Sequence, residues 1–381
     1  MRIGKIAMRD LPVVLMFYIF PIVSLLLLWI KGIAIVNYDY VWGGLLGYIL
    51  IRAFFKKVLV FDRVQFIFLS ILLVLIICKY ILPYFWYDHI VLKAAIMDGK
   101  WIVYLLFSVL WVRIYGYPSI SVVYNGCLFF STLYIIVAVL RILSGTISRA
   151  GILMESNYDG FMILMVYCFI DNVSQKVRWG HVIMIVATFC TLSRTGTASL
   201  FAIMFLKFIK KKPYLLLAFI PFVAIAIYLG LSIRGDSAEN LDRFVYFSQA
   251  FMYFDSVDWS MLLLGSTPGI SLKMPVLSEF EWTISNFENM RDLQGIFPFY
   301  FHSTYLRLAF TWGILIALGF IFYFIMNFFR AKYEPLRWLC VLVLIQSFSL
   351  STLTLPNVSV LFFLLFMLAL KGQKDATKLL T

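Results

Sequence analysis

One histidine stands where a long polar segment of the sequence gives way to an apolar run: His302, in PFYFHSTYLRLAFTWGILI. Histidine is the side chain best suited to general acid–base chemistry near neutral pH. At such a junction it has access both to water and to a substrate carried in lipid. The alternative is an interfacial histidine that satisfies only a local hydrogen bond. His181, expected on the cytoplasmic side, and His89, in a loop without a basic cluster, are weaker candidates.

Arginines expected on the same side of the membrane as His302 form the second candidate set: Arg149, Arg194, Arg234, Arg243 and Arg307. Arg194, in TLSRTGTAS, is flanked by small residues that allow a ligand or a neighbouring backbone to approach closely. An arginine near hydrocarbon is costly and usually faces a cavity or an anion. Its planar fork suits diphosphate oxygens better than a lysine does. The alternative is an arginine that extends to lipid headgroups, which carries most weight for Arg307 and Arg141.

Several signatures of other chemistries are missing from the sequence. There is no GxxxxGK[ST] loop for a nucleotide and no HExxH or Cys/His set for a metal. The five cysteines lie inside apolar runs without CxxC spacing. Glu155, Asp159 and Asp171 lie near the ends of apolar runs, which weakens a proton-relay or ion-coupled transporter. We therefore expect neither a metal ion nor a cofactor.

The composition shows which kind of element must position these residues. Of the 381 residues, 63% are hydrophobic and only 13% are charged, and the mean hydropathy is +0.95. A soluble domain has about 25% charged residues, so a soluble enzyme or a disordered scaffold is excluded. The composition predicts an all-α polytopic membrane protein. The formal charge of +13 then needs no nucleic-acid partner, because basic residues hold loops on the cytoplasmic side.

Twelve apolar runs are long enough to be predicted as transmembrane helices, with a range of 10–12. They lie near residues 11–30, 38–54, 64–82, 100–116, 119–140, 157–173, 179–192, 196–210, 213–232, 303–328, 336–354 and 357–371. The pair 179–192 and 196–210 is short, and one long helix broken near 193–196 is the alternative. With a cytoplasmic N-terminus and twelve spans, 20 of the 32 Lys and Arg residues lie on the cytoplasmic side. Both termini are therefore expected to be cytoplasmic.

One long soluble segment divides the chain into predicted regions. Residues 1–232 hold nine spans, 233–302 form a large periplasmic loop, 303–371 hold three spans and 372–381 form a cytoplasmic tail. The loop has too many aromatic residues for disorder. Its segment LDRFVYFSQAFMYF predicts an amphipathic helix at the outer membrane surface, with an apolar face at helical spacing. That face consists of Leu241, Phe244, Val245, Phe251 and Met252.

Three stretches resemble the superfamily of bacterial O-antigen polymerases and O-antigen ligases, and they occur in the same order. An SRTG-like segment at the outer end of a central span is matched by residues 193–196. A large periplasmic loop that opens with an arginine on a helix and continues to a Leu-Leu-Gly turn is matched by Arg243 and residues 262–265. The closing pattern H-[NSQ]-x9-G is matched by His302-Ser303 and Gly313.

A further pattern of that family, R-x10-G, is met by Arg149 and Gly160. The resemblance covers roughly residues 145–320. The sequence departs from the family at Ile316, where a small residue is frequent, and its large loop has a single histidine.

The resemblance implies a metal-independent glycosyltransferase at the periplasmic face of the bacterial inner membrane. It would polymerise lipid-linked repeat units, moving glycan from an undecaprenyl-diphosphate donor to a sugar hydroxyl of an undecaprenyl-diphosphate-linked acceptor. His302 would be the general base and Arg243 a catalytic partner, while Arg194, Arg234 and Arg149 would bind diphosphate. Trp259, Trp282 and Tyr305 would contact the glycan. A membrane protein that regulates chain length is a further possible partner.

Three alternatives stay open. An O-antigen ligase, which moves glycan to lipid A core, shares the arginine and histidine layout. A flippase or transporter for lipid-linked oligosaccharide would suit twelve spans, but two similar halves are missing and the outer loop is long. A structural membrane protein would leave the outer arginines and His302 without a role.

Overall fold

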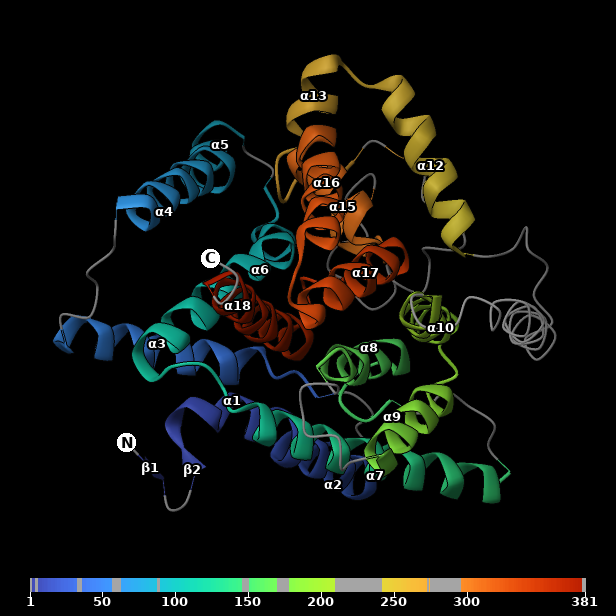
Figure 1. Ribbon diagram of the computed structural model, residues 1–381. Coiled ribbons are helices and arrows are strands. Elements are labelled where there is room, and N and C mark those ends of the chain that lie inside the picture. Colours follow the sequence, from blue (N-terminus) through green and yellow to red (C-terminus); the bar gives the residue numbers. More distant parts are fainter. Residues whose placement is uncertain are drawn as a thin grey trace.

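The structure, a computed structural model, describes residues 2–3, 6–32, 36–56, 63–87, 90–145, 151–169, 178–209, 242–272, 274 and 296–378. These residues are mostly helical, and the helices pack into one bundle (Figure 1). The chain begins with a short antiparallel pair of strands, β1 (Arg2–Ile3) and β2 (Ile6–Ala7). The helical character predicted from composition is confirmed.

The described helices are divided between two halves of the chain. In the first half they are η1 (Met8–Asp10), α1 (Leu11–Val14), η2 (Leu15–Ile19), α2 (Phe20–Lys31), α3 (Asp39–Lys56), α4 (Arg63–Ile76), η3 (Ile77–Ile81), α5 (Leu82–Trp86), α6 (Leu92–Tyr115), α7 (Ile120–Leu143) and α8 (Ser156–Tyr167). In the second half they are α9 (Arg178–Cys190), α10 (Arg194–Ile209), α12 (Asp242–Ser256), α13 (Trp259–Leu264), η7 (Pro298–Tyr300), α15 (Thr304–Trp312), α16 (Ile314–Arg330), α17 (Glu334–Ser349) and α18 (Pro356–Lys378).

Four described helical stretches are long and apolar enough to cross a membrane: Met8–Ile30, Leu92–Tyr115, Ile120–Leu143 and Pro356–Ala376. Their mean hydropathy lies between 1.4 and 2.7. Shorter apolar helices accompany them at Leu73–Trp86, Trp179–Cys190 and Ile314–Arg330. The predicted span at 213–232 lies outside the described residues.

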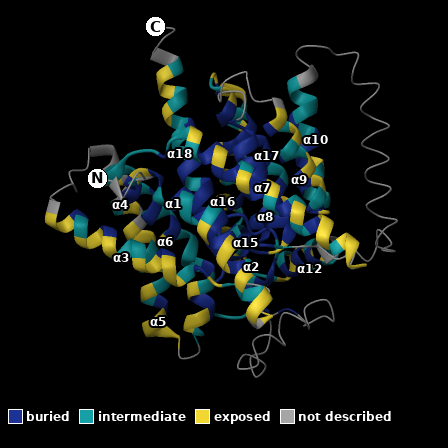
Figure 2. Ribbon diagram, turned by 90° about the horizontal axis from the view of Figure 1, so that it is seen from below, coloured by how far each residue is buried: buried dark blue, intermediate teal, exposed yellow. Residues whose placement is uncertain are grey.

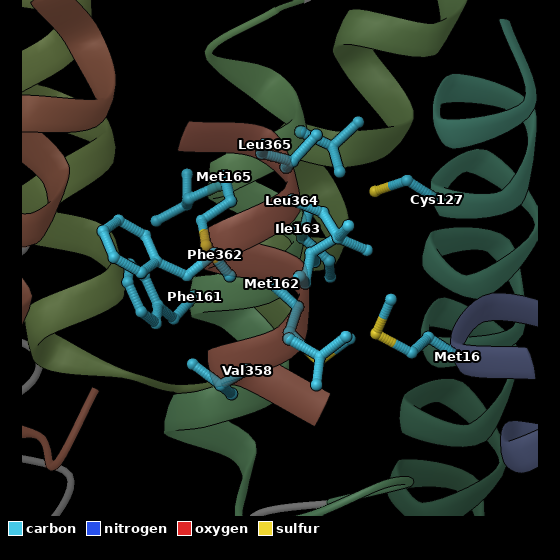
Figure 3. Close-up of a cluster of buried hydrophobic side chains, with 14 of the residues drawn as sticks. Met16, Cys127, Phe161, Met162, Ile163, Met165, Val358, Phe362, Leu364 and Leu365 are labelled. Atoms are coloured by element: carbon cyan, nitrogen blue, oxygen red, sulfur yellow. The ribbon is translucent and has the colours of Figure 1, made fainter. Parts of the chain in front are cut away.

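Helix α8 forms the centre of the bundle. All twelve of its residues are buried, and α7, α9, α10, α17 and α18 contact it. Figure 3 shows its side chains, among them Phe161 and Met165, meeting Phe362 and Leu365 of α18, with Met16 and Cys127 across the cluster. Helix α8 is therefore surrounded by other helices rather than by lipid.

In addition to its apolar core, the bundle has large apolar side chains at its surface and polar side chains in its interior. Large apolar side chains such as Trp29, Phe54 and Phe85 are more than 70% exposed, while polar ones such as Gln346 and Asn357 are fully buried. Figure 2 shows buried residues in the middle of the bundle and exposed ones along its outer helices. This arrangement suits a lipid surrounding, in which polar groups turn inward.

Two predicted spans are refined by the structure. The uncertain pair at 179–192 and 196–210 consists of two helices, α9 and α10, which are separated by a turn in which Leu192 has a φ of 51°. The predicted span 303–328 is interrupted between α15 and α16, because Gly313 has a φ of 88° that a continuous helix does not allow.

The amphipathic helix predicted in the large loop is present as α12, but its packed face differs from the prediction. Tyr246, Ala250 and Tyr253 face the protein and are buried. Phe251 and Met252 are 71% and 62% exposed. The helix therefore has apolar side chains on two faces, one packed against the protein and one exposed. The sequence pattern identified the exposed face.

Candidate functional site

A run of hydroxyl side chains at the end of α17 and before α18 lies at the centre of the candidate site. We call residues 347–354 (SFSLSTLT) the serine–threonine segment. Its hydroxyl residues are all buried: Ser347, Ser349, Ser351, Thr352 and Thr354. Within an apolar bundle, such groups need internal partners, because lipid offers none.

The chain around His302 is bonded to the serine–threonine segment on both sides. The Ser351 hydroxyl donates to the Phe301 carbonyl at 2.9 Å, and the Ser303 hydroxyl donates to the Ser347 carbonyl at 3.1 Å. The Thr304 amide and hydroxyl both donate to the Leu350 carbonyl, at 3.0 and 2.8 Å. Ser303 also caps α15, since its oxygen accepts from the Leu306 amide. The backbone that carries His302 is thus fixed.

The SRTG segment meets the same serine–threonine segment from α10. The Thr195 and Ser349 hydroxyls lie 2.6 Å apart. Ser193 caps the helix by accepting a hydrogen bond from the Gly196 amide at 3.0 Å. The half-buried Arg194 is the first residue of α10. Arg194 and His302, 108 positions apart in the chain, therefore flank one polar segment.

Helix α12 covers this region through two aromatic contacts. The Tyr246 ring lies 6.4 Å from the His302 ring, at 29° to it. The Phe247 and Phe348 rings stack with centroids 4.6 Å apart. Arg243 lies one turn before both on the same helix, which places its backbone on the side of α12 that faces the site. Its side chain lies outside the described residues.

The two glycines of the loop motifs lie against each other. A β-carbon on Gly265 would lie 2.5 Å from the Gly313 amide nitrogen, and one on Gly313 would overlap the Leu263 carbonyl oxygen. Both glycines have positive φ values, 74° and 88°. The Ser266 amide donates to the Phe310 carbonyl at 2.6 Å beside them. The end of α13 is thus joined to α15 at a distance that only glycine permits.

Arg307 faces inward. Its guanidinium lies 3.2 Å from the Asp98 carboxylate of α6 and donates to the Thr354 hydroxyl at 2.7 Å and to the Met97 carbonyl at 3.1 Å. Both side chains of the ion pair are buried. The alternative of an Arg307 that extends to lipid headgroups is therefore wrong.

The residues predicted to contact the glycan do not lie together in the described structure. The Tyr305 hydroxyl donates to the Leu344 carbonyl at 2.5 Å, so that side chain packs against α17. Trp259 is 77% exposed at the start of α13. Arg149, Arg234, Trp282 and His89 lie outside the described residues. His181 contacts Tyr167 at the start of α9, away from this cluster of contacts.

Two tyrosines on the elements that flank His302, Tyr253 of α12 and Tyr300 of η7, are uncharged. Burial raises the pKa of the Tyr253 and Tyr300 hydroxyls above the ordinary phenol value, so both stay neutral at physiological pH. Within the described ranges, no three His, Cys, Asp or Glu side chains gather as a metal site requires. Such a place can hold an anion by arginine and accept a proton on histidine.

Two parts of the site are not among the residues predicted from the sequence. The predicted span 336–354 includes the serine–threonine segment, although its alternating hydroxyl residues are a signal of a polar connection. The second part is Asp98, the acid that directly precedes the apolar run beginning near residue 100.

No protein-family model and no curated protein matches this chain. The function must therefore be argued from the site.

Proposed function

We propose that the chain is a membrane glycosyltransferase that polymerises lipid-linked oligosaccharide repeat units. The observation that carries the proposal is the pair of contacts Thr195–Ser349 and Ser303–Ser347, at 2.6 and 3.1 Å. Through them, an arginine suited to diphosphate and a histidine suited to proton transfer flank the same buried segment. In a helical, lipid-facing bundle, this combination fits a substrate carried on a lipid diphosphate.

The proposed reaction is a glycosyl transfer that needs one general base and a stabilised leaving group. His302 accepts the proton of the acceptor sugar's hydroxyl, and that oxygen forms a bond to the anomeric carbon of the donor sugar. The bond from this carbon to the phosphate oxygen breaks, and its electron pair leaves on undecaprenyl diphosphate. Arg194 and Arg243, with Arg234 and Arg149, neutralise the charge that develops on the leaving diphosphate.

The proposal includes an arrangement in the membrane. Twelve crossings with both termini in the cytoplasm put the large loop, His302 and the arginines on the periplasmic side of the inner membrane. Basic residues that are common at the opposite ends of the spans support this orientation.

The experiment is complementation of a strain that lacks this chain, scored by the length distribution of its surface glycan. His302→Ala and Arg243→Ala are each expected to abolish long glycan at normal protein level, because the base or the leaving-group charge is lost. The control is Arg141→Ala, at the end of α7, which should restore long chains. Long glycan from both site variants would refute the mechanism.

The deletion strain itself separates polymerase from ligase. Loss of a polymerase leaves single repeat units on lipid A core, whereas loss of a ligase leaves the core without any repeat. Bare core would therefore replace the polymerase proposal with the ligase alternative.

A further inference from the structure

A second polar site lies next to the contacts that hold His302, and Thr304 of α15 belongs to both. It is a pocket between α6, α15 and the serine–threonine segment, and its lining includes Asp98, Trp101, Thr304, Arg307, Trp312 and Thr354. Thr304 joins it to the candidate active site, since Thr304 follows His302 by two positions and also bonds the serine–threonine segment. The proposed mechanism gives this pocket no role.

Two buried polar atoms in the wall of this pocket have no hydrogen-bond partner among the described residues: Asp98 Oδ2 and Trp312 Nε1. A third atom of this kind, the Tyr80 hydroxyl oxygen, lies nearby. Tyr80 lies behind the pocket wall: its ring is 6.0 Å from that of Trp312, and a β-carbon on Gly99 would lie 3.2 Å from its hydroxyl. Buried polar groups are normally paired, so two unpaired ones in the wall of one pocket indicate a missing occupant.

The charges and donors define what the occupant must be. Arg307 is already neutralised by Asp98 at 3.2 Å, so the pocket offers no net positive charge to a phosphate. The second oxygen of Asp98 requires a donor, whereas the Trp312 N–H requires an acceptor. A neutral hydroxyl group both donates and accepts, and therefore satisfies both sides.

The size and the walls of the pocket further limit which occupants can fit. The pocket leaves about 20 Å³ for the centres of water-sized groups, which admits one or two hydroxyl groups but no complete sugar ring. Trp101 and Trp312 stand beside it with ring centroids 6.1 Å apart, and both are half-buried. Aromatic faces of this kind pack against the C–H surface of a ring whose hydroxyls point inward.

We propose that this pocket binds the hydroxyl-bearing edge of a sugar in the lipid-linked acceptor. The inference rests on the proposed function and assigns its acceptor side to residues that no motif marks. With Thr304 shared between the pocket and the chain at His302, a sugar held here would present another of its hydroxyls toward the proposed base.

Two conservative variants test the inference without removing any hydrogen bond of the described structure. Tyr80→Phe and Trp312→Phe each delete one unpaired polar atom and keep an aromatic ring. Because an unpaired buried polar atom is unfavourable, the apparent Tm of the ligand-free protein is expected to stay the same or to rise. Binding of the sugar is expected to weaken about three- to tenfold in Trp312→Phe, whose indole N–H lines the pocket, and less in Tyr80→Phe, whose hydroxyl lies behind the pocket wall. A purely structural role predicts no loss of binding.

The measurement uses the full chain purified in detergent. The probe is the oligosaccharide released by mild acid from the lipid-linked repeat units of a strain that lacks this chain, and its affinity is measured by calorimetric titration. The matched control is Trp29→Phe, which removes an indole that is 84% exposed at the end of α2. The control should bind as the wild type does.

The outcomes separate the inference from the proposed function. Weaker binding by Trp312→Phe, with undiminished Tm and an unaffected control, supports it. Unchanged affinity of Trp312→Phe overturns it and leaves a water molecule as the occupant. A lowered Tm of Trp312→Phe, or no binding by the wild type, also overturns it. If the inference is overturned, the proposed function still stands when reconstituted wild-type protein elongates lipid-linked repeat units and His302→Ala abolishes this elongation. No elongation by the wild type would refute the proposed function itself.

Discussion

His302 is held by the residues beside it in the chain. The Phe301 carbonyl accepts from Ser351, and Ser303 both caps α15 and donates to the Ser347 carbonyl. Each bond of this type contributes about 0.5–1.5 kcal/mol. Fixing the backbone on both sides limits where the His302 side chain can lie, which is part of the preorganisation that a general base needs.

Arg194 and Arg307 have different electrostatic environments. Arg307 forms a buried ion pair with Asp98, so its charge is consumed within the protein. Arg194 begins a helix whose N-terminus adds a partial positive charge at the same place. Arg194 is therefore the better candidate for an external anion.

The first residue-scale prediction concerns Arg194→Lys. If the guanidinium grips diphosphate through two parallel bonds, lysine keeps the charge but loses the fork. We expect kcat for elongation of lipid-linked repeat units by reconstituted protein to fall roughly ten- to hundredfold. Arg141→Lys, at the end of α7, is the matched control. Equal rates for the Arg194 variant and the wild type would show that only charge matters there.

The ion pair of Arg307 shows which contacts a sequence cannot reveal. Asp98 lies 209 positions away in the chain, and neither residue belongs to a local pattern that would join them. In contrast, His302 and Arg194 stand out by residue type and by their position at the ends of apolar runs. Their shared contact with the serine–threonine segment required the structure, because it depends on how α10, α15 and α17 pack.

At the scale of elements, the break between α15 and α16 decides how the large loop joins the bundle. The apolar run from 303 to 328 predicts one helix, since periodicity carries no information on a single torsion angle. Gly313 at a φ of 88° ends that helix, and the space of its missing side chain is taken by the Leu263 carbonyl. The motif glycine is thus explained by a contact between two elements.

The element-scale prediction is the effect of Gly313→Ala. A side chain at this φ of 88° and ψ of 163°, a region almost confined to glycine, costs about 1–3 kcal/mol in backbone energy, and the overlap with Leu263 adds to it. We expect the apparent Tm in detergent to fall by roughly 5 °C or more, and α13 to become more sensitive to protease. The matched control is Gly319→Ala within α16, where a β-carbon would meet nothing within 4 Å.

That control has an expected sign of its own. Alanine in a helix interior is more favourable than glycine by about 0.5–1 kcal/mol, so Gly319→Ala should leave Tm unchanged or raise it. A Gly313→Ala protein as stable and as protease-resistant as this control would refute the role given to the contact between Gly265 and Gly313.

At the scale of the whole molecule, composition is a sound guide to the kind of fold but not to its centre. The excess of apolar residues predicts a helical bundle in lipid, and the described helices agree. The sequence does not distinguish α8 from the other apolar runs, yet all twelve of its residues are buried. Burial is a property of neighbours, and the exposed Trp29 and the buried Trp42 look alike in the sequence.

The orientation of the molecule gives the last prediction. From the basic residues near the ends of the spans, we expect both termini and the KKK run at 210–212 in the cytoplasm and the large loop outside. In a variant without its five native cysteines, single cysteines are placed at Asp258, Lys211 and Lys374. Asp258, between α12 and α13, and Lys374, near the end of α18, are both exposed. Lys211 lies outside the described residues.

A membrane-impermeant maleimide then reports the side on which each cysteine lies. Asp258→Cys should react in cells whose outer membrane alone is permeabilised. Lys211→Cys and Lys374→Cys should react only after the inner membrane is opened. Labelling of Lys211→Cys from outside would mean that α9 and α10 do not form two crossings. Labelling of Asp258→Cys only from inside would put His302 on the cytoplasmic face and would refute a reaction at the periplasmic face.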